Sequence, residues 1–422
     1  MTTTLRQHLS QHNPVGATWA FVLAVMLLLP ALLFSRFMPD WAPFVALAGL
    51  VVIFALRSIT VGGGSGYTPL DWPLLLLLLL LAGLWTTLDL SVSLPRTYGF
   101  IANLALFGVV AAQRNASWLR WCGWLLLLAG LVGSPIIFLY TDLGGNQLPF
   151  INQDIYALLP DDLRPFWNQG FNSNVTGGVL TFFLAPAVAL IFRGESWQQR
   201  DFAKLVAVVL SILLVLTQAR GAIIGAIIAL LVITSLQSRR WSLFWLVVVV
   251  AAAIRIYYSG LAPVLEVLLG KGDLLGDSNL RGRLDLWQQA IHLIRDFPLA
   301  GVGLGMVEPA IKLLYPTSLI DAAASFHHVH NIYLQTAAEM GIPGLIVHLL
   351  IYLSLFYLLL QRARDDQAGR SQALTLGLLG SLIAFLVNGF LNVIIFSPLV
   401  AVVVWSFFGL MVAVATSSIN ER

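Results

Sequence analysis

Long apolar runs alternate with short polar stretches along the chain. Residues 74–85, "LLLLLLLLAGLW", are continuously apolar and lack the in-and-out alternation of a half-buried strand. A bilayer span needs about 20 such residues in a helix, because every backbone polar group must be satisfied inside the segment. The pattern predicts twelve membrane-spanning helices, at about 17–36, 41–57, 70–88, 96–113, 117–140, 175–192, 203–218, 220–237, 241–258, 331–360, 371–394 and 397–416.

Two polar stretches interrupt this pattern. The shorter, 141–174, is rich in Asp, Asn, Pro and aromatic residues, and the longer covers 259–330. The longer stretch contains one amphipathic helix, "SNLRGRLDLWQQAIHLIRD", which Pro298 and the glycines of "GVGLGM" end and which Asp277 or Ser278 caps. Its predicted apolar stripe consists of Leu284, Trp287, Ile291 and Ile294. We therefore expect an N-terminal transmembrane bundle over 1–258, a long loop over 259–330 and C-terminal helices over 331–422.

The composition agrees with this division. Hydrophobic residues make up 59% of the 422 residues, charged residues 10%, and the mean hydropathy is +0.87. A soluble domain carries about a quarter charged residues, so we expect an all-α, polytopic integral membrane protein. The single cysteine, Cys122, has no internal partner for a disulfide. The first span is long and lacks a small-residue cleavage site, which favours an anchor over a removed signal peptide.

Lys and Arg residues set the expected orientation, because cytoplasmic segments carry an excess of them. With the N-terminus inside, the segments on the cytoplasmic side hold Arg6, Arg57, Arg114, Arg120, Arg193, Arg200, Lys204, Arg239, Arg240, Arg362, Arg364, Arg370 and Arg422. The short outer segments hold only Arg36, Arg96, Arg164 and Arg220. Both termini are therefore expected in the cytoplasm, and the loops 141–174 and 259–330 outside.

Arginines gather in the outward part. Arg281, Arg283 and Arg295 lie on or beside the amphipathic helix, with Arg255 nearby, and Arg220 occupies a tight turn between two spans, "TQARGAIIG". An arginine at membrane depth is costly and hence a functional candidate, although it can also snorkel to lipid headgroups. The helix arginines can equally form a solvated face. Clustered, they suit a phosphate or pyrophosphate through bidentate hydrogen bonds.

Histidines gather as well, because "HHVHNIYLQ" places His327, His328 and His330 at the head of a predicted span. A metal site is one interpretation, but the chain has no HExxH and no nearby Cys or carboxylate completes a ligand set. A structural, hydrogen-bonded role is a second interpretation. We favour catalysis, because a neutral imidazole can take a proton from a hydroxyl nucleophile near pH 7.

Nucleotide and nucleic-acid chemistry has little support. "GVGLGM" looks like a nucleotide-binding glycine pattern, but it follows no predicted strand and is expected to form a turn. The chain contains no P-loop, so no ATP site is expected, and no nucleic-acid partner is indicated.

Two segments stand out when taken together, "GRLDLWQQAIHLIRDFPLAGVGLGM" and "HHVHNIYLQTAAEMGIPGL". They resemble the signature region of the O-antigen ligase and polymerase family of bacterial envelopes. The matching positions are Arg283, Trp287, Pro298, Gly301, His330, Asn331, Tyr333, Leu334 and Gly341. "ARGA" at Arg220 resembles a second family feature, in which Ser usually stands where this chain has Ala219. The resemblance covers roughly 205–400 and the twelve-span plan.

The resemblance implies glycosyl transfer at the periplasmic face of the bacterial inner membrane. The donor is a glycan on undecaprenyl pyrophosphate, and no metal or other cofactor is implied. The acceptor is a sugar hydroxyl of lipid A–core oligosaccharide in the ligase, another lipid-linked repeat unit in the polymerase, and a protein hydroxyl in a third branch.

The resemblance and the residue chemistry together assign roles. Arg220 and Arg283, helped by Arg281, stabilise the pyrophosphate leaving group. His330 is the general base, with His328 in reserve. The further substrate-binding residues are expected to be Asn331, Trp287 and Tyr333. A direct displacement inverts the anomeric carbon.

Three alternatives stay open. We favour the ligase over the polymerase, on the compact pair of outer loops with one dominant loop. The protein-modifying branch usually carries an added soluble C-terminal region, which this sequence lacks. A lipid-glycan transporter would explain twelve spans, but it should place charges along the bundle interior. A transferase releases undecaprenyl pyrophosphate, whereas a transporter leaves the donor intact.

Overall fold

The computed structural model describes residues 14–61, 72–113, 116–143, 171–260, 280–315, 326, 328–364, 371–396 and 398–417. His327, Asp277, Ser278 and much of both predicted outer loops lie outside these residues. Almost every described element is a helix, as expected. The exceptions among these residues are two short strands, β1 (Thr141–Asp142) and β2 (Phe171–Asn172), which pair in parallel.

Nine α-helices lie in the described chain up to residue 259, and the longest connection among them is between α6 and α7. They are α2 (Pro14–Leu33), α3 (Trp41–Val61), α4 (Trp72–Thr86), α5 (Leu90–Ala111), α6 (Ala116–Leu139), α7 (Ser173–Arg193), α8 (Trp197–Leu216), α9 (Arg220–Gln237) and α10 (Arg239–Ser259), with the 3-10 turn η1 (Ser35–Phe37) after α2. The later helices are α12 (Leu280–Asp296), α13 (Val307–Leu314), α14 (Ile332–Arg364), α15 (Ser371–Asn388) and α16 (Pro398–Thr416).

Each predicted span coincides with one helix, and several helices are long and apolar enough to cross a membrane. Six described helices meet both conditions, and five shorter apolar helices accompany them. α8 belongs to neither group, because Arg200, Asp201 and Lys204 fall in its first half. The protein is thus a multi-pass membrane protein. Twelve crossings, and the division at 258 and 330, stay predictions.

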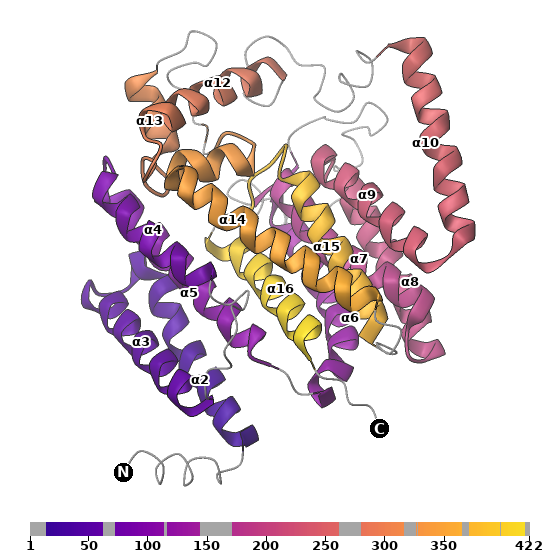
Figure 1. Cartoon of the computed structure of the whole chain (residues 1–422), viewed down its shortest axis with the longest axis horizontal. Helices are drawn as coiled ribbons and strands as arrows, with labels where there is room; N and C mark the ends of the chain where they lie inside the picture. Colours follow the sequence, from indigo (N-terminus) through magenta and orange to yellow (C-terminus); the bar gives the residue numbers. More distant parts are fainter. Residues whose placement is uncertain are drawn as a thin grey trace.

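The helices form a tilted bundle with α12 and α13 lying across one end (Figure 1). α7 packs against α8, α9 and α15, and α16 packs against α5, so early and late helices share one core. Its largest fully buried side chains include Trp405, Phe107, Phe182, Phe385 and Phe408. α10 stands at the edge of the bundle and buries none of its residues (Figure 1).

The predicted apolar stripe of α12 was partly wrong. Leu284 and Ile291 are exposed, whereas Trp287 and Ile294 are half-buried. The buried face consists of Arg283, Leu286, Ala290 and Leu293. The helix is turned so that an arginine points inward, which a purely apolar pattern does not anticipate.

α14 is broken near its start, and the "GVGLGM" segment fills the break. Gly341 has φ 72° and ψ 177°, so the helical hydrogen-bond ladder is interrupted there. Carbonyls of the first part accept from the turn instead: Val302 N–H donates to Ala338 O at 2.9 Å and Gly303 N–H to Glu339 O at 3.1 Å. On the other side, Ile342 N–H donates to Pro298 O at 2.7 Å. The prediction of a turn is confirmed, and the turn fastens the end of α12 to α14.

Candidate active site

The segment at the C-terminal end of α15, residues 386–392, is the point where the candidate residues meet. The head of α14 is tied to it by three hydrogen bonds. Ile332 N–H donates to Gly389 O at 2.8 Å, the Tyr333 hydroxyl to Leu386 O at 2.9 Å, and the Asn331 amide to Phe390 O at 3.3 Å. We call residues 386–392 the hub segment. Its free carbonyls exist because α15 ends there, so the chain turn itself supplies the acceptors.

Arg283 and the Arg220 turn reach the hub segment from two other directions. Arg283 is 8% exposed, and its Nη1 donates to Leu391 O at 3.3 Å. Gly221, next to Arg220, packs so closely that a Cβ there would lie 3.1 Å from Leu391 Cβ and 2.7 Å from Asn392 Nδ2. Arg220 itself is half-buried at the first position of α9. Arg283 and Gly221, the residue next to Arg220, thus both lie against Leu391.

His330 lies beside this pair, just before α14. It is 8% exposed and adopts φ +53°, a left-handed conformation that is uncommon for residues other than glycine. Its ring lies edge-on to that of His328, with the centroids 4.4 Å apart. Burial first, and then the neighbouring His328 and Arg283, hold the pKa of His330 well below its usual range. The imidazole is therefore neutral near pH 7, as a general base must be.

Trp287 and Asn331 hold the backbone on either side of His330. Trp287, one turn after Arg283 on α12, donates from Nε1 to Val329 O at 2.9 Å. Asn331 caps α14: its Oδ1 accepts from Tyr333 N–H and from Leu334 N–H, each at 3.0 Å. Trp287, Asn331 and Tyr333 thus have structural partners, and their predicted contacts with substrate stay predictions. The backbone amide of His330 donates to His328 Nδ1 at 3.3 Å.

Other predicted cations lie apart from this group. Arg255 on α10 and Arg295 near the end of α12 are exposed, which fits the solvated interpretation. Arg281 belongs to α12, but its side chain lies outside the described residues, as does His327. Over the described part of the chain, His, Cys, Asp and Glu side chains form no group of three suited to a metal ion.

Several buried polar residues near the site were not selected as candidates from the sequence. Asn388 and Asn392 are 1% and 2% exposed, and Asn392 Nδ2 donates to Asn388 Oδ1 at 2.7 Å beneath Gly221. Glu339 on α14 is 2% exposed. The available signal was the presence of amides and a carboxylate inside otherwise apolar runs, where polar groups are costly.

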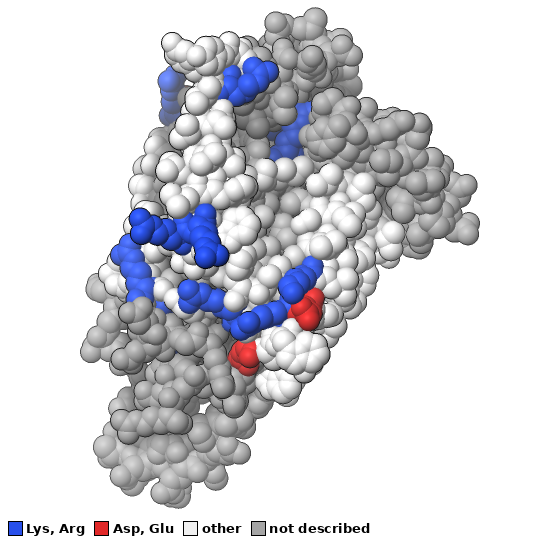
Figure 2. Space-filling model, turned by 90° about the vertical axis from the view of Figure 1, so that its right-hand side faces the viewer, with Lys and Arg blue, Asp and Glu red and all other residues white. Residues whose placement is uncertain are grey.

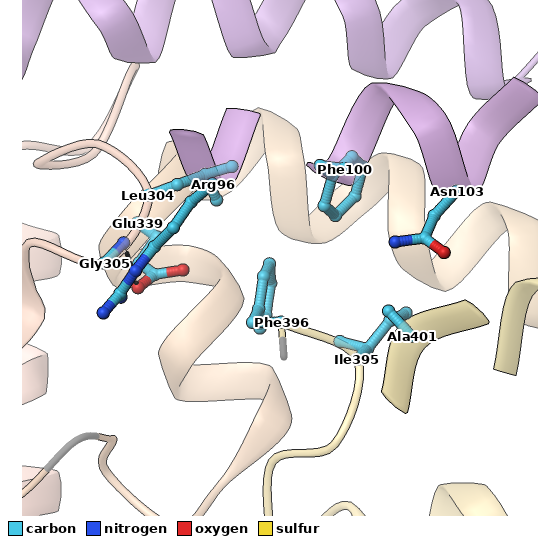
Figure 3. A pocket seen from close by; sticks show the side chains of 9 residues that line it. All are labelled: Arg96, Phe100, Asn103, Leu304, Gly305, Glu339, Ile395, Phe396 and Ala401. Atoms are coloured by element: carbon cyan, nitrogen blue, oxygen red, sulfur yellow. Dashed lines mark hydrogen bonds between the residues drawn. The ribbon is translucent and has the colours of Figure 1, made fainter. Parts of the chain in front are cut away.

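Glu339 also lines a pocket. The pocket contains about 280 Å³ of empty space, including the part open to solvent, and Arg96 and Glu339 lie together at one side of it (Figure 3). Phe100, Phe396 and Asn103 form much of the remaining wall (Figure 3). Phe396 follows the hub segment in the chain, and Glu339 lies on α14 nine positions after His330.

Chemically, the arrangement pairs a neutral imidazole with buried guanidinium charge. The imidazole can accept a proton from a hydroxyl, and the guanidinium can stabilise an anionic leaving group.

Comparison with known proteins agrees with this chemistry. Residues 205–349 match a family model described as O-antigen ligase. Exopolysaccharide production protein ExoQ of Rhizobium meliloti (strain 1021) is 30% identical over 195 residues, which cover 44% of this chain and 41% of that protein. The chain therefore matches less than half the length of this curated relative. Arg220, Arg283 and His330 all lie inside the matched region, so the residues of the candidate site fall in the part of the chain that is similar to O-antigen ligases.

Proposed function

We propose that this protein is an O-antigen ligase, which transfers a glycan from undecaprenyl pyrophosphate to a sugar hydroxyl of lipid A–core oligosaccharide. One observation carries the proposal: Arg283, the Arg220 turn and the head of α14 with His330 converge on the hub segment. Convergence of buried cations and a neutral base suits a reaction with an anionic leaving group and a hydroxyl nucleophile.

The proposed mechanism is a single displacement. His330 takes the proton of the acceptor hydroxyl while its oxygen forms a bond to the anomeric carbon of the donor. The bond from that carbon to the pyrophosphate oxygen breaks, and undecaprenyl pyrophosphate leaves with the electron pair. Arg283 and Arg220, with Arg281 as helper, stabilise the charge that grows on the pyrophosphate. The product then has the inverted anomeric configuration.

The distribution of charge supports a periplasmic site and cytoplasmic termini. The helix ends that flank the α7–α8 and α9–α10 connections carry basic residues: Arg193, Arg200, Lys204, Arg239 and Arg240. Figure 2, which views the molecule from the right of Figure 1, shows a band of basic side chains across the middle of that face, with a few more near its top. The positive-inside rule makes this the cytoplasmic side. α12 and the candidate site lie at the opposite end (Figure 1), which is then the periplasmic side of the inner membrane.

The test uses purified protein in lipid with a lipid-linked glycan donor, with and without lipid A–core. Release of undecaprenyl pyrophosphate should require the acceptor and yield glycan-bearing lipopolysaccharide. His330→Asn should reduce it by about 100-fold or more, because removal of a general base costs 10²–10⁴-fold. Asn is chosen because it tolerates the left-handed backbone. The matched control is His292→Asn, a half-buried histidine of α12 that stacks on Tyr315. A donor left intact under every condition would overturn the proposal and favour transport.

A second candidate is a polymerase that uses the same donor. The observation in its favour is the relative named for exopolysaccharide production. The same assay separates the two: a polymerase forms longer lipid-linked chains from donor alone, without lipid A–core.

A further inference from the structure

Glu339 is a buried acid for which the proposed mechanism has no use. It lies on α14, nine positions after His330, and is 2% exposed. Its Oε1 accepts from Gly305 N–H at 2.7 Å and from Gln335 Nε2 at 2.8 Å, while its Oε2 accepts no hydrogen bond from the described residues. A carboxyl group buried in a membrane protein is costly and needs a reason.

On one side, Glu339 connects to the histidine segment through Gln335. Gln335 Nε2 donates to Glu339, and Gln335 Oε1 accepts from Val329 N–H at 2.9 Å. The carbonyl of Val329 is held in turn by Trp287 Nε1 at 2.9 Å. Both backbone groups of the residue before His330 are therefore fixed by side chains from different helices. A residue held in a sparsely populated conformation requires such fixation.

On the other side, Glu339 connects to the turn that follows α12. Gly305 N–H donates to its side chain, and Gly303 N–H donates to its main-chain carbonyl at 3.1 Å. The Arg96 side chain of α5 lies against the same turn, where a Cβ on Gly305 would meet its guanidinium (Figure 3). The helix that carries Arg283 is thereby fastened to the helix that follows His330.

We propose that Glu339 and Gln335 are positioning residues, which set the place of His330 relative to Arg283 through Val329 and the 301–306 turn. This inference rests on the proposed function. Neither side chain is assigned contact with the substrate. Both act by fixing backbone, so their loss should lower the rate of transfer without weakening donor binding.

The kinetic test compares Gln335→Ala and Glu339→Ala with the parent in the transfer assay. We expect kcat to fall by about 30- to 100-fold with donor KM unchanged within about twofold, since a shift of about 1 Å in a reacting group costs on that order. Glu339→Gln keeps an acceptor oxygen for Gly305 and Gln335, and should retain most of the activity. A large rise in donor KM would overturn the proposal in favour of direct binding.

The matched control is Gln199→Ala. Gln199 is also a buried glutamine whose Oε1 accepts a backbone amide, that of Glu195 at 2.8 Å. Gln199 lies beside Gly194, at the end of α7 that is remote from the site. Gly178, near the other end of α7, contacts Asn388, and the two glycines are about 24 Å apart along the helix at 1.5 Å per residue. Equal losses in Gln199→Ala and Gln335→Ala would show a general packing effect and overturn the proposal.

A second readout does not depend on turnover. Diethyl pyrocarbonate modifies accessible histidines, and the rate at His330 can be followed by mass spectrometry. Because His330 is buried, modification should be slow in the parent, at least tenfold faster in Gln335→Ala, and unchanged in Gln199→Ala. An unchanged rate in Gln335→Ala would contradict positioning. If the parent transfers no glycan but the rate still rises, the proposed function fails and the positioning role stands.

Discussion

α7 and α10 are similar in length and hydropathy, but α7 is largely buried and α10 is exposed. Each has 21 residues, and their most apolar stretches have mean hydropathies of 2.1 and 1.8. Yet 78% of that stretch is buried in α7 and none in α10. Small residues alone do not explain the difference, because the three alanines at 251–253 of α10 are exposed.

The two helices differ in whether their small residues contact a neighbouring helix. Gly177 of α7 faces Ala219 and Ala222 beside the Arg220 turn, and Gly178 faces Asn388. In a bilayer, apolar side chains gain nothing by leaving lipid, so close packing and polar contacts hold helices together. α10 instead carries aromatic residues at both ends, Trp241 and Trp245 near the first and Tyr257 and Tyr258 near the last, as interfacial anchors do. Hydropathy identifies a span, and close contacts decide its neighbours.

The largest effect should follow from filling the α7 contact. In Gly177→Val, the new Cβ would overlap Ala219 Cβ and approach Thr217 Oγ1 to 3.1 Å. The Arg220 turn must then move, and we expect glycan transfer to fall by about 100-fold or more, together with a lower unfolding temperature. Ala252→Val on α10 adds two methyl groups at an exposed position and should change neither. Normal activity of Gly177→Val would show that the Arg220 turn is not part of the site.

A smaller loss of transfer rate should follow from replacing the buried Arg283, and none from replacing the exposed Arg255. Arg283→Lys keeps the charge but loses the planar guanidinium, so transfer should fall by about 30-fold. Arg255→Lys on α10 should have the parent's rate, because Arg255 is exposed. Steady-state kinetics of the two variants test this. Equal rates would remove Arg283 from the proposed pyrophosphate site.

The smallest effect concerns the pH dependence of transfer, which tests the assignment of His330 as the base. Because the pKa of His330 is held well below 6.5, the neutral base persists as pH falls through 6.5, and kcat/KM should decline only at lower pH. His328→Asn removes the second cause of this shift, so the acid limb should move upward toward 6.5. The depressed pKa of His330 also affects folding stability. As pH falls below 6.5, the unfolded chain binds a proton at this histidine before the folded protein does, so the free energy of unfolding decreases. A parent limb at 6.5 or above would contradict the assignment of His330.

Much of the helical plan followed from hydrophobicity, because continuous apolar runs leave the backbone no alternative to a helix in lipid. The convergence of Arg283, Trp287 and His330 was anticipated through the family resemblance, and the structure brings these residues together. The buried face of α12 was not predicted. The predicted stripe contained only apolar residues and therefore omitted Arg283, which is buried because it contacts the hub segment.

The break in α14 and the polar residues around it were also missed. Gly341 gives no local sign of whether it kinks a helix, because the break depends on distant partners: the Pro298 carbonyl, which accepts from Ile342, and the Val302 amide, which donates to Ala338. Asn388 and Asn392 read as the end of an apolar run. Their role follows from the helix packed against them, at Gly221, which sequence alone does not place.

The order of synthesis gives the break in α14 a further meaning. A ribosome delivers α12 and the 301–306 turn well before Ala338 and Glu339, whose carbonyls satisfy that turn, and the hub segment emerges later still. In the proposed orientation, this segment crosses the membrane before its amides have these carbonyl partners, and it acquires them only when α14 has been made. A nascent chain released before residue 392 lacks part of the hub segment, so the proposed glycan transfer requires the chain through that residue.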